Sequence, residues 1–384
     1  MKNFLHTLKK YSIIFVITLI LLEIGSYIVL RVTSSSSSTT TENTSSYTHI
    51  PLTIYKQQND EGVIQPIQTA VVPVKENYES RWAYREFNVS VKTNAKGLRE
   101  NETLENHEVD IAFFGDSFTF GHGVEVDERY SNILAASDSL QKYKVANYAY
   151  LSGFQPEHYE FFIRNNKDLQ AKHVVVGMYI GNDLASDIQE TNYDRTTNNL
   201  EIPMRMISEE GSIYNAPKLY IFPINKLIKY SYFTKLVVKM INRSHYRAVL
   251  FENLLPNVPN SIALETGQES IENNRGIIAL QELDNMISKR GGKLTVLLIP
   301  QNYFFSKKNP HIHPELKDKI QEVIKGDNVY KAIQTELTKR NIDFFDPMPV
   351  LSESSYFDED AHWNKKGHKE VGEALANHIE KLQK

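Results

Sequence analysis

Residues 109–121 read VDIAFFGDSFTFG. In this stretch a short apolar run is followed directly by a turn and a serine. The run VDIAFF has the pattern of a buried strand. Ser117 follows the turn, at the start of a helical segment. In an open parallel sheet, ligands bind beyond the carboxyl ends of the strands. A serine placed there presents its hydroxyl at the sheet edge, close to backbone N–H groups.

Similar apolar runs recur along the chain. They lie at 143–148, 173–180, 293–299 and 342–345. Helical patterns separate most of them, and Leu280, Leu283, Met286 and Ile287, for example, share one helical face. Strands that alternate with helices predict an α/β domain, with a mainly parallel five-stranded sheet covered by helices on both faces.

The composition excludes several classes of function. The chain of 384 residues has no cysteine, which rules out disulfides, thiolate zinc sites and a cysteine nucleophile. A net charge of -4 gives no reason to expect a nucleic-acid partner. His311 and His313 form an HIH triplet, but Pro314 follows and the sequence shows no acidic or histidine partner, so we interpret it as a loop. We expect neither a metal nor a cofactor.

The N-terminus has the pattern of a membrane anchor. Residues 1–10 carry Lys2, Lys9 and Lys10 and no acid, and residues 11–32 are almost wholly apolar. A run of roughly 20 apolar residues is long enough to cross a bilayer as a helix. The lysines favour a cytoplasmic tail, so we expect a single-pass protein of the cytoplasmic membrane with the remaining chain outside. A cleaved signal peptide is the alternative, although its apolar core is usually shorter.

The rest of the chain divides by composition. Residues 33–50 form a Ser/Thr-rich linker, and residues 51–108 resemble an N-terminal extension laid over the main domain. The main domain spans 109–384 and contains an insertion at about 184–259. Within this insertion, residues 219–250 are basic and carry no acid. We interpret this stretch as a packed helix with a solvated basic face, or else as a surface for anionic headgroups or an acidic glycan.

Four further residues lie where they can act together with Ser117. Gly153 and Asn182 follow the second and third predicted strands, so a backbone N–H and a side-chain amide can donate to an oxyanion. Asp360 and His362 precede the last predicted helix, with a spacing that lets one loop supply both a base and its orienting acid. Taken singly, these are ordinary cap and turn residues. Their joint order at successive strand ends predicts a Ser117 nucleophile, a His362 base, and an oxyanion hole of Ser117, Gly153 and Asn182.

These residues carry a family resemblance. From about residue 94 to the C-terminus the chain resembles SGNH hydrolases of the GDSL class, whose four blocks contribute Ser, Gly, Asn and His. The resemblance implies a three-layer α/β/α, flavodoxin-like fold. Residues 93–100, TNAKGLRE, resemble the N-x-x-G-x-R stretch that often precedes the nucleophile strand in membrane-anchored bacterial members.

The last block departs from the common Asp-x-x-His pattern, which would give the acid role to Glu359. The D-x-H-W-N-x-x-G-H form resembles a variant in relatives that modify polysaccharides. We therefore favour Asp360 as the orienting acid, with Glu359 and then Asp358 as alternatives. His368 is interpreted as a structural residue of the final helix.

The sequence and the resemblance together predict a serine-dependent acyl ester hydrolase or O-acyltransferase at the cell envelope, acting on O-acetyl groups of a polysaccharide. The expected partners are an acylated carbohydrate or other ester, and the membrane through the N-terminal helix. Hydrolysis and transfer stay open. The alternatives are a lipid or lysophospholipid esterase, and a non-catalytic envelope assembly protein that keeps the fold.

Overall fold

The computed structural model describes part of the 384-residue chain. The described residues are 11, 15, 17–28, 63–64, 74–149, 154–181, 183–184, 192–201, 205–207, 213–215, 231–233, 271–305 and 328–383. The chain divides into two compact units, each of which is described by itself. One unit comprises 1–43, 59–62 and 216–257, and the other comprises 44–58, 63–215 and 258–384.

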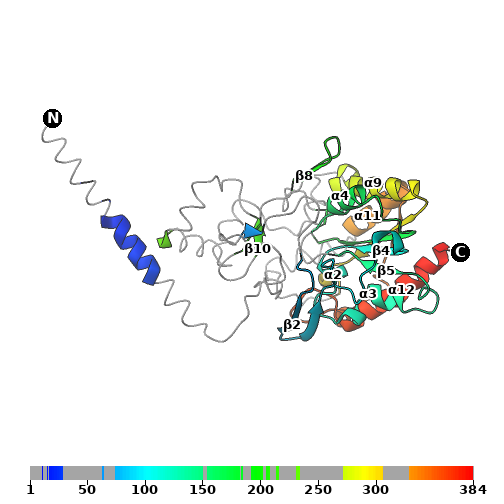
Figure 1. Ribbon diagram of the computed structural model, residues 1–384, viewed down its shortest axis with the longest axis horizontal. Helices are drawn as coiled ribbons and strands as arrows, with labels where there is room; N and C mark the ends of the chain where they lie inside the picture. Colours follow the sequence, from blue (N-terminus) through cyan, green and yellow to red (C-terminus); the bar gives the residue numbers. More distant parts are fainter. Residues whose placement is uncertain are drawn as a thin grey trace. The chain divides into compact units, whose positions relative to one another are not determined.

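The larger unit is built on a five-stranded parallel sheet (Figure 1). Its strands are β4 (Ile111–Phe114), β5 (Val145–Asn147), β6 (His173–Tyr179), β11 (Lys293–Ile299) and β12 (Asp343–Phe345). They lie in the order β12-β11-β6-β4-β5. Each strand falls within one of the five apolar runs, so the predicted parallel sheet is confirmed. Apolar residues predominate in these strands because helices cover both faces of the sheet.

Helices on the two faces bury alternate residues of the strands. They are α3 (Tyr130–Ala135) and α12 (Lys365–Gln383) on one face, and α4 (Pro156–Asn165), α9 (Arg275–Lys289) and α11 (Asn328–Lys339) on the other (Figure 1). On β4, Phe113 packs in the cluster that contains α3 and α12, and Phe114 packs in the opposite cluster. The predicted apolar face of α9 is confirmed, because Leu280, Leu283 and Ile287 are all buried.

Short elements complete the described chain. The helix that follows β4 is α2 (Ser117–Phe120), and 3₁₀ turns lie at η2 (Asn106–Glu108), η3 (Val126–Glu128), η4 (Ile271–Asn273), η5 (Asn302–Phe304) and η6 (Glu353–Ser355). The small antiparallel strands are β1 (Val63–Ile64), β9 (Arg205–Ile207) and β10 (Ile213–Asn215) in one sheet, and β7 (Asn192–Asp194) and β8 (Asn199–Glu201) in another.

The stretch before the nucleophile strand forms an antiparallel hairpin of β2 (Glu79–Tyr84) and β3 (Phe87–Lys92). Along β3 every second residue is buried, as expected for a strand with one face against a core. Trp82, Val89 and Val91 of this hairpin belong to the same apolar cluster as Phe114. The hairpin therefore packs directly on the main sheet domain.

The described N-terminal residues, 11, 15 and 17–28, are helical. Among the residues that the structure describes, no helix is both long enough and apolar enough to cross a membrane. Within this smaller unit, Glu23 accepts hydrogen bonds from the Ser231 hydroxyl and from the backbone N–H groups of Tyr232 and Phe233. The HIH triplet and all the basic side chains of residues 219–250 lie outside the described residues.

Candidate active site

Ser117 lies at the carboxyl end of β4, where the chain turns from strand to helix. Asp116 is the N-cap of α2, and its side chain accepts the backbone N–H of Phe118 at 3.0 Å. A side chain at Gly115 would collide with Thr119, so the turn requires glycine at that position. The strand end and this tight cap place the Ser117 side chain at the sheet edge, largely buried but not sealed, with 9% of the residue exposed.

The loop before α12 brings the other two predicted residues to Ser117. The Ser117 Oγ and the His362 Nε2 lie 2.7 Å apart. On the other side of the ring, the His362 Nδ1 bonds to Asp360 Oδ1, which also accepts the His362 backbone N–H at 2.9 Å. The structure thus aligns a hydroxyl, an imidazole and a carboxylate in the order that nucleophilic serine chemistry requires.

The electrostatics of this group suit a general base. Burial lowers the pKa of His362, but the charge of Asp360 and its hydrogen bond outweigh burial and raise the pKa above the usual value. Burial raises the pKa of Asp360, yet the neighbouring His362 and His122 outweigh it and hold that pKa well below its usual range. Asp360 therefore stays ionised and favours a proton on the His362 ring.

The two alternative acids make other contacts, Glu359 through its side chain and Asp358 through its backbone. The Glu359 carboxylate pairs with Arg85 at 2.9 Å and accepts the Tyr84 hydroxyl at 3.3 Å. The backbone N–H of Asp358 donates to Glu86 at 2.6 Å. Of the three candidate acids, Asp360 is the one that bonds to the His362 ring in the described structure.

The two predicted oxyanion donors other than Ser117, Gly153 and Asn182, lie outside the described residues, so their roles stay predictions. Next to Asn182, Asp183 is buried and accepts the backbone N–H of Tyr179 at 2.8 Å. Burial, followed by the charge of Asp116, raises the pKa of Asp183. The bond to Tyr179 ties the start of this loop to the end of β6.

His122 is a site residue that the sequence reasoning missed. It is fully buried, and its Nε2 lies 3.3 Å from Asp360 Oδ2. The sequence feature that could have indicated His122 is the motif FGHG, in which a histidine lies between two glycines at the end of α2. His122, Asp360 and His362 also form a group with potential metal-ligating atoms within 4.8 Å of one another. Within this group, Asp360 bonds to the His362 ring, and His362 in turn approaches Ser117.

Aromatic rings hold the catalytic loop against α2. The Phe118 ring lies 4.6 Å from the His362 ring, stacks on Tyr179 at 4.8 Å and meets Trp363 edge-on at 5.2 Å, measured between centroids. Such contacts fix the plane of an imidazole by packing. They also cover the ring from solvent on the side of Phe118.

His368 lies on α12, away from this chain of bonds. It is fully buried, its ring stacks on Tyr130, and its Nδ1 accepts the Tyr130 backbone N–H at 3.3 Å. Burial, followed by the charge of His362, lowers its pKa to about 3. Its contacts are those of a neutral histidine that joins α12 to α3.

Two solved structures illustrate what this chain is similar to, both at low sequence identity. A putative arylesterase from Agrobacterium tumefaciens is 12% identical over 71% of this chain and 98% of its own, with a TM-score of 0.36. Est24, a carbohydrate acetylesterase from Sinorhizobium meliloti, is 12% identical over 71% and 99%, with a TM-score of 0.33. No curated protein sequence matches the chain at a significant level.

A family model gives a firmer comparison. Residues 262–384 match the SGNH hydrolase-like domain of acetyltransferase AlgX. Asp360 and His362 lie within the matched residues, whereas Ser117 lies before them. The resemblance to SGNH hydrolases that the sequence indicated is thereby confirmed, through the part of the chain that supplies the histidine and its acid.

Proposed function

We propose that this protein is a serine-dependent acyl ester hydrolase or O-acyltransferase that acts on O-acetyl groups of a polysaccharide. The observation that carries the proposal is the 2.7 Å approach of Ser117 Oγ to His362 Nε2, with Asp360 bonded to the far side of the ring. The match of residues 262–384 to an acetyltransferase-type SGNH domain supports an acyl group as the transferred unit.

The reaction proceeds in two halves. His362 Nε2 takes the Ser117 proton while the oxygen attacks the ester carbonyl carbon, and the negative charge moves to the carbonyl oxygen. We assign stabilisation of that oxygen to the Ser117 backbone N–H together with Gly153 and Asn182. His362 then gives the proton to the leaving alcohol, and the acyl group stays on Ser117.

The second half releases the acyl group. His362 removes a proton from water or from a sugar hydroxyl, whose oxygen attacks the acyl carbon. The Ser117 oxygen leaves and recovers the proton from His362. Water yields a free carboxylic acid, and a sugar hydroxyl yields a new ester, so one set of residues serves hydrolysis and transfer alike.

Turnover of p-nitrophenyl acetate by the purified chain tests this proposal. We expect Ser117→Ala to reduce turnover by roughly 10³-fold or more, because the covalent route is lost. A fluorophosphonate probe should label the native chain at Ser117 only. Ser354→Ala is the matched control, since this serine is exposed on the loop before α12 and should keep full activity. Near-full turnover by the Ser117→Ala variant would overturn the serine mechanism and favour a non-catalytic role.

The acyl chain length separates the two kinds of ester substrate. A short acyl group requires only a shallow pocket beside Ser117, whereas a long chain requires an extended apolar groove. We expect activity to fall steeply as p-nitrophenyl esters lengthen from acetate to octanoate. Equal or rising activity with octanoate would favour a lipid or lysophospholipid esterase.

The place of action is part of the proposal and rests on the sequence of the N-terminus. The lysine-flanked apolar run supports a tether that holds the enzyme on the outer side of the cytoplasmic membrane. A reporter fused after residue 50 should then be active only outside the cytoplasm. A reporter that works only inside would reverse the proposed orientation.

A further inference from the structure

We propose that His122 is a positioning residue: it holds the Asp360 carboxylate in the orientation that His362 requires, and Arg99 fixes the turn that presents it. This inference rests on the serine mechanism proposed above and deepens it.

His122 connects the nucleophile to the acid. Its backbone N–H donates to the carbonyl oxygen of Ser117 at 3.0 Å. Its ring Nε2 lies 3.3 Å from Asp360 Oδ2. A proton on Nε2 would give the ring an N–H group within 3.3 Å of that oxygen. A single residue therefore sets the distance between the backbone of α2 and the loop that carries His362.

The two oxygens of Asp360 have different partners. Oδ1 accepts the backbone N–H of His362 and also bonds to its ring Nδ1, whereas Oδ2 faces His122. The terminal torsion of an aspartate is broad and roughly two-fold, so a carboxylate held at one oxygen can still rotate. A donor on the second oxygen fixes the plane of the carboxylate and hence the tautomer and direction of the His362 ring.

The turn that carries His122 has a backbone conformation that glycine adopts without strain. Gly121 and Gly123, on either side of it, have φ angles of 82° and 79°. A side chain at Gly123 would come within 2.7 Å of Phe357. Because φ is positive at both positions, other residues would strain the turn. The turn is therefore shaped to bring the histidine inward, under the loop that bears Asp360.

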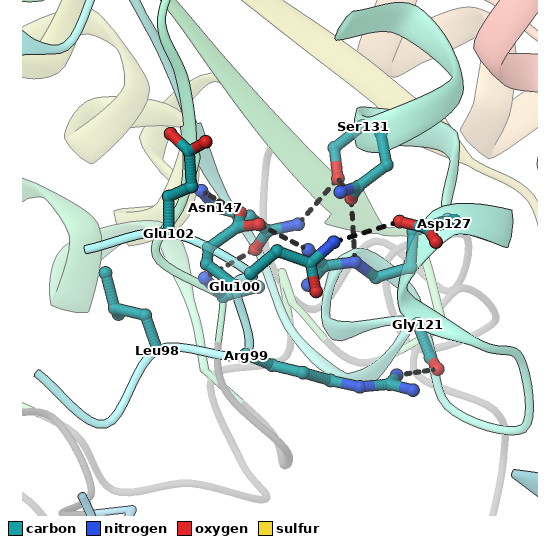
Figure 2. A network of polar contacts seen from close by, with 12 residues as sticks. Leu98, Arg99, Glu100, Glu102, Gly121, Asp127, Ser131 and Asn147 are labelled. Atoms are coloured by element: carbon teal, nitrogen blue, oxygen red, sulfur yellow. Dashed lines mark hydrogen bonds and ion pairs between the residues drawn. The ribbon is translucent and has the colours of Figure 1, made fainter. Parts of the chain in front are cut away.

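Arg99 clamps this turn from beneath, and Figure 2 shows its side chain reaching the Gly121 carbonyl. The guanidinium donates to the carbonyl oxygens of Gly121 and Val124, each at 2.6 Å, and to that of Phe120 at 3.2 Å. Arg99 is itself buried. A planar group that binds three carbonyls of one turn holds its shape more firmly than a flexible lysine can. This gives a physical role to the arginine of the N-x-x-G-x-R stretch.

The β2–β3 hairpin encloses His122. Phe87 meets its ring edge-on at 5.2 Å between centroids, and Trp82 lies 6.3 Å away. Aromatic walls exclude water, and in a low dielectric a hydrogen bond to a carboxylate is stronger than in water. These aromatic neighbours make phenylalanine a suitable replacement for His122, because it keeps a flat ring but has no polar atom.

Two variants of the full-length chain test whether His122 acts by donating a hydrogen bond or only by filling space. His122→Phe keeps a flat ring but removes the N–H, whereas His122→Gln keeps an N–H at about the reach of Nε2. For p-nitrophenyl acetate we expect His122→Phe to lower kcat roughly 10–100-fold with KM within about twofold, because a small misplacement of a catalytic group costs that much. His122→Gln should recover most of kcat. If His122→Phe fails to fold, His122→Met supplies the variant without a donor.

A titration of the His362 ring by NMR gives a readout that does not depend on turnover. The titratable groups that interact with this ring are Asp360, Asp116, His122 and His368. In the native chain and in His122→Gln we expect the raised pKa of His362, and in His122→Phe a fall toward the ordinary value. An unchanged His362 pKa in His122→Phe overturns the inference, as does equal loss of kcat in both variants. A native chain that shows this pKa pattern but neither turns over esters nor reacts with the fluorophosphonate would instead overturn the proposed function.

Discussion

The side-chain carboxylate of Glu86 accepts the backbone N–H of Asp360 at 3.1 Å, although 274 positions separate the two residues in sequence. The same carboxylate accepts the N–H groups of Asp358 at 2.6 Å and Glu359 at 2.8 Å. One acid at the tip of the β2–β3 hairpin therefore binds three consecutive amides of the catalytic loop. The hairpin contributes to the site by holding the loop, while the reacting groups come from the sheet domain.

Removal of the Glu86 carboxylate should weaken catalysis. We expect Glu86→Ala to lower kcat roughly tenfold and the free energy of unfolding by about 1–3 kcal/mol, because three amides lose a charged acceptor. Arg85→Ala is the matched control in the same turn. Its ion pair with Glu359 is well exposed, and such pairs contribute little. Steady-state kinetics and urea unfolding of both variants provide the comparison, and equal effects would show that the hairpin tip has no specific role.

The identity of the acid can be tested with two adjacent residues. Asp360→Asn should lower kcat by roughly 10²–10⁴-fold, because an amide cannot hold His362 in the productive tautomer. Glu359→Gln should change kcat by less than about threefold, since that side chain pairs with Arg85 at the surface. A larger loss in Glu359→Gln than in Asp360→Asn would move the acid role to Glu359.

The pH dependence of kcat/KM should report His362. The base must be neutral to accept the Ser117 proton, and Asp360 raises its pKa above the usual value of 6.5. Activity should therefore be lost as the pH falls through that raised pKa, with the midpoint above 6.5. In Asp360→Asn the residual activity should show its acid limb at lower pH, because the charge that raised the pKa is absent. An acid limb that stays in place would mean that another group controls it.

Arg99 should matter for stability beyond its role in the active site. Arg99→Met leaves carbonyl oxygens of one turn without their donor inside the protein, and we expect a loss of roughly 3 kcal/mol or more. Arg81→Met is the control, because Arg81 is exposed and, among the described residues, its bonds go to Asn88 of the same β2–β3 hairpin. Chemical unfolding of the two variants measures the difference. A loss below about 1 kcal/mol in Arg99→Met would show that water replaces the guanidinium at this turn.

The lowered pKa of His368 in the folded protein predicts that the free energy of unfolding depends on pH. Its folded pKa of about 3 lies below the unfolded value of 6.5, so between these values the unfolded chain binds a proton that the folded chain excludes. This group therefore lowers the free energy of unfolding as the pH falls from 6.5 toward 3, by up to about 1.4 kcal/mol per pH unit.

The matched variant for this effect is His368→Asn. Its amide oxygen can replace Nδ1 as the acceptor for Tyr130 but does not titrate. The difference between the native and variant unfolding free energies should shrink as the pH falls, because contributions from all other groups cancel. Parallel curves would show that His368 titrates normally in the folded protein.

The sequence by itself determined the sheet and the local part of the site. Five mainly apolar runs sufficed to locate five parallel strands, because strands covered on both faces of a parallel sheet are near-continuously apolar. The relation of Asp360 to His362 was also readable, since two residues on one loop can meet only within a small set of geometries. Ser117 was identified by its place after the first strand, where the fold exposes a side chain.

Tertiary structure alone decided which residues hold these groups in place. His122 lies 238 positions from Asp360, and Glu86 lies in a hairpin with no catalytic motif. The N-x-x-G-x-R stretch that contains Arg99 gave no indication of what this arginine contacts. Each acts through a contact with a residue distant in the chain, and such contacts leave no periodic pattern in the sequence. Spacing predicted the candidate reacting residues because they are close in the chain or fixed to strand ends. The residues that orient them became visible only once the hairpin and the turn at His122 were folded against the same loop.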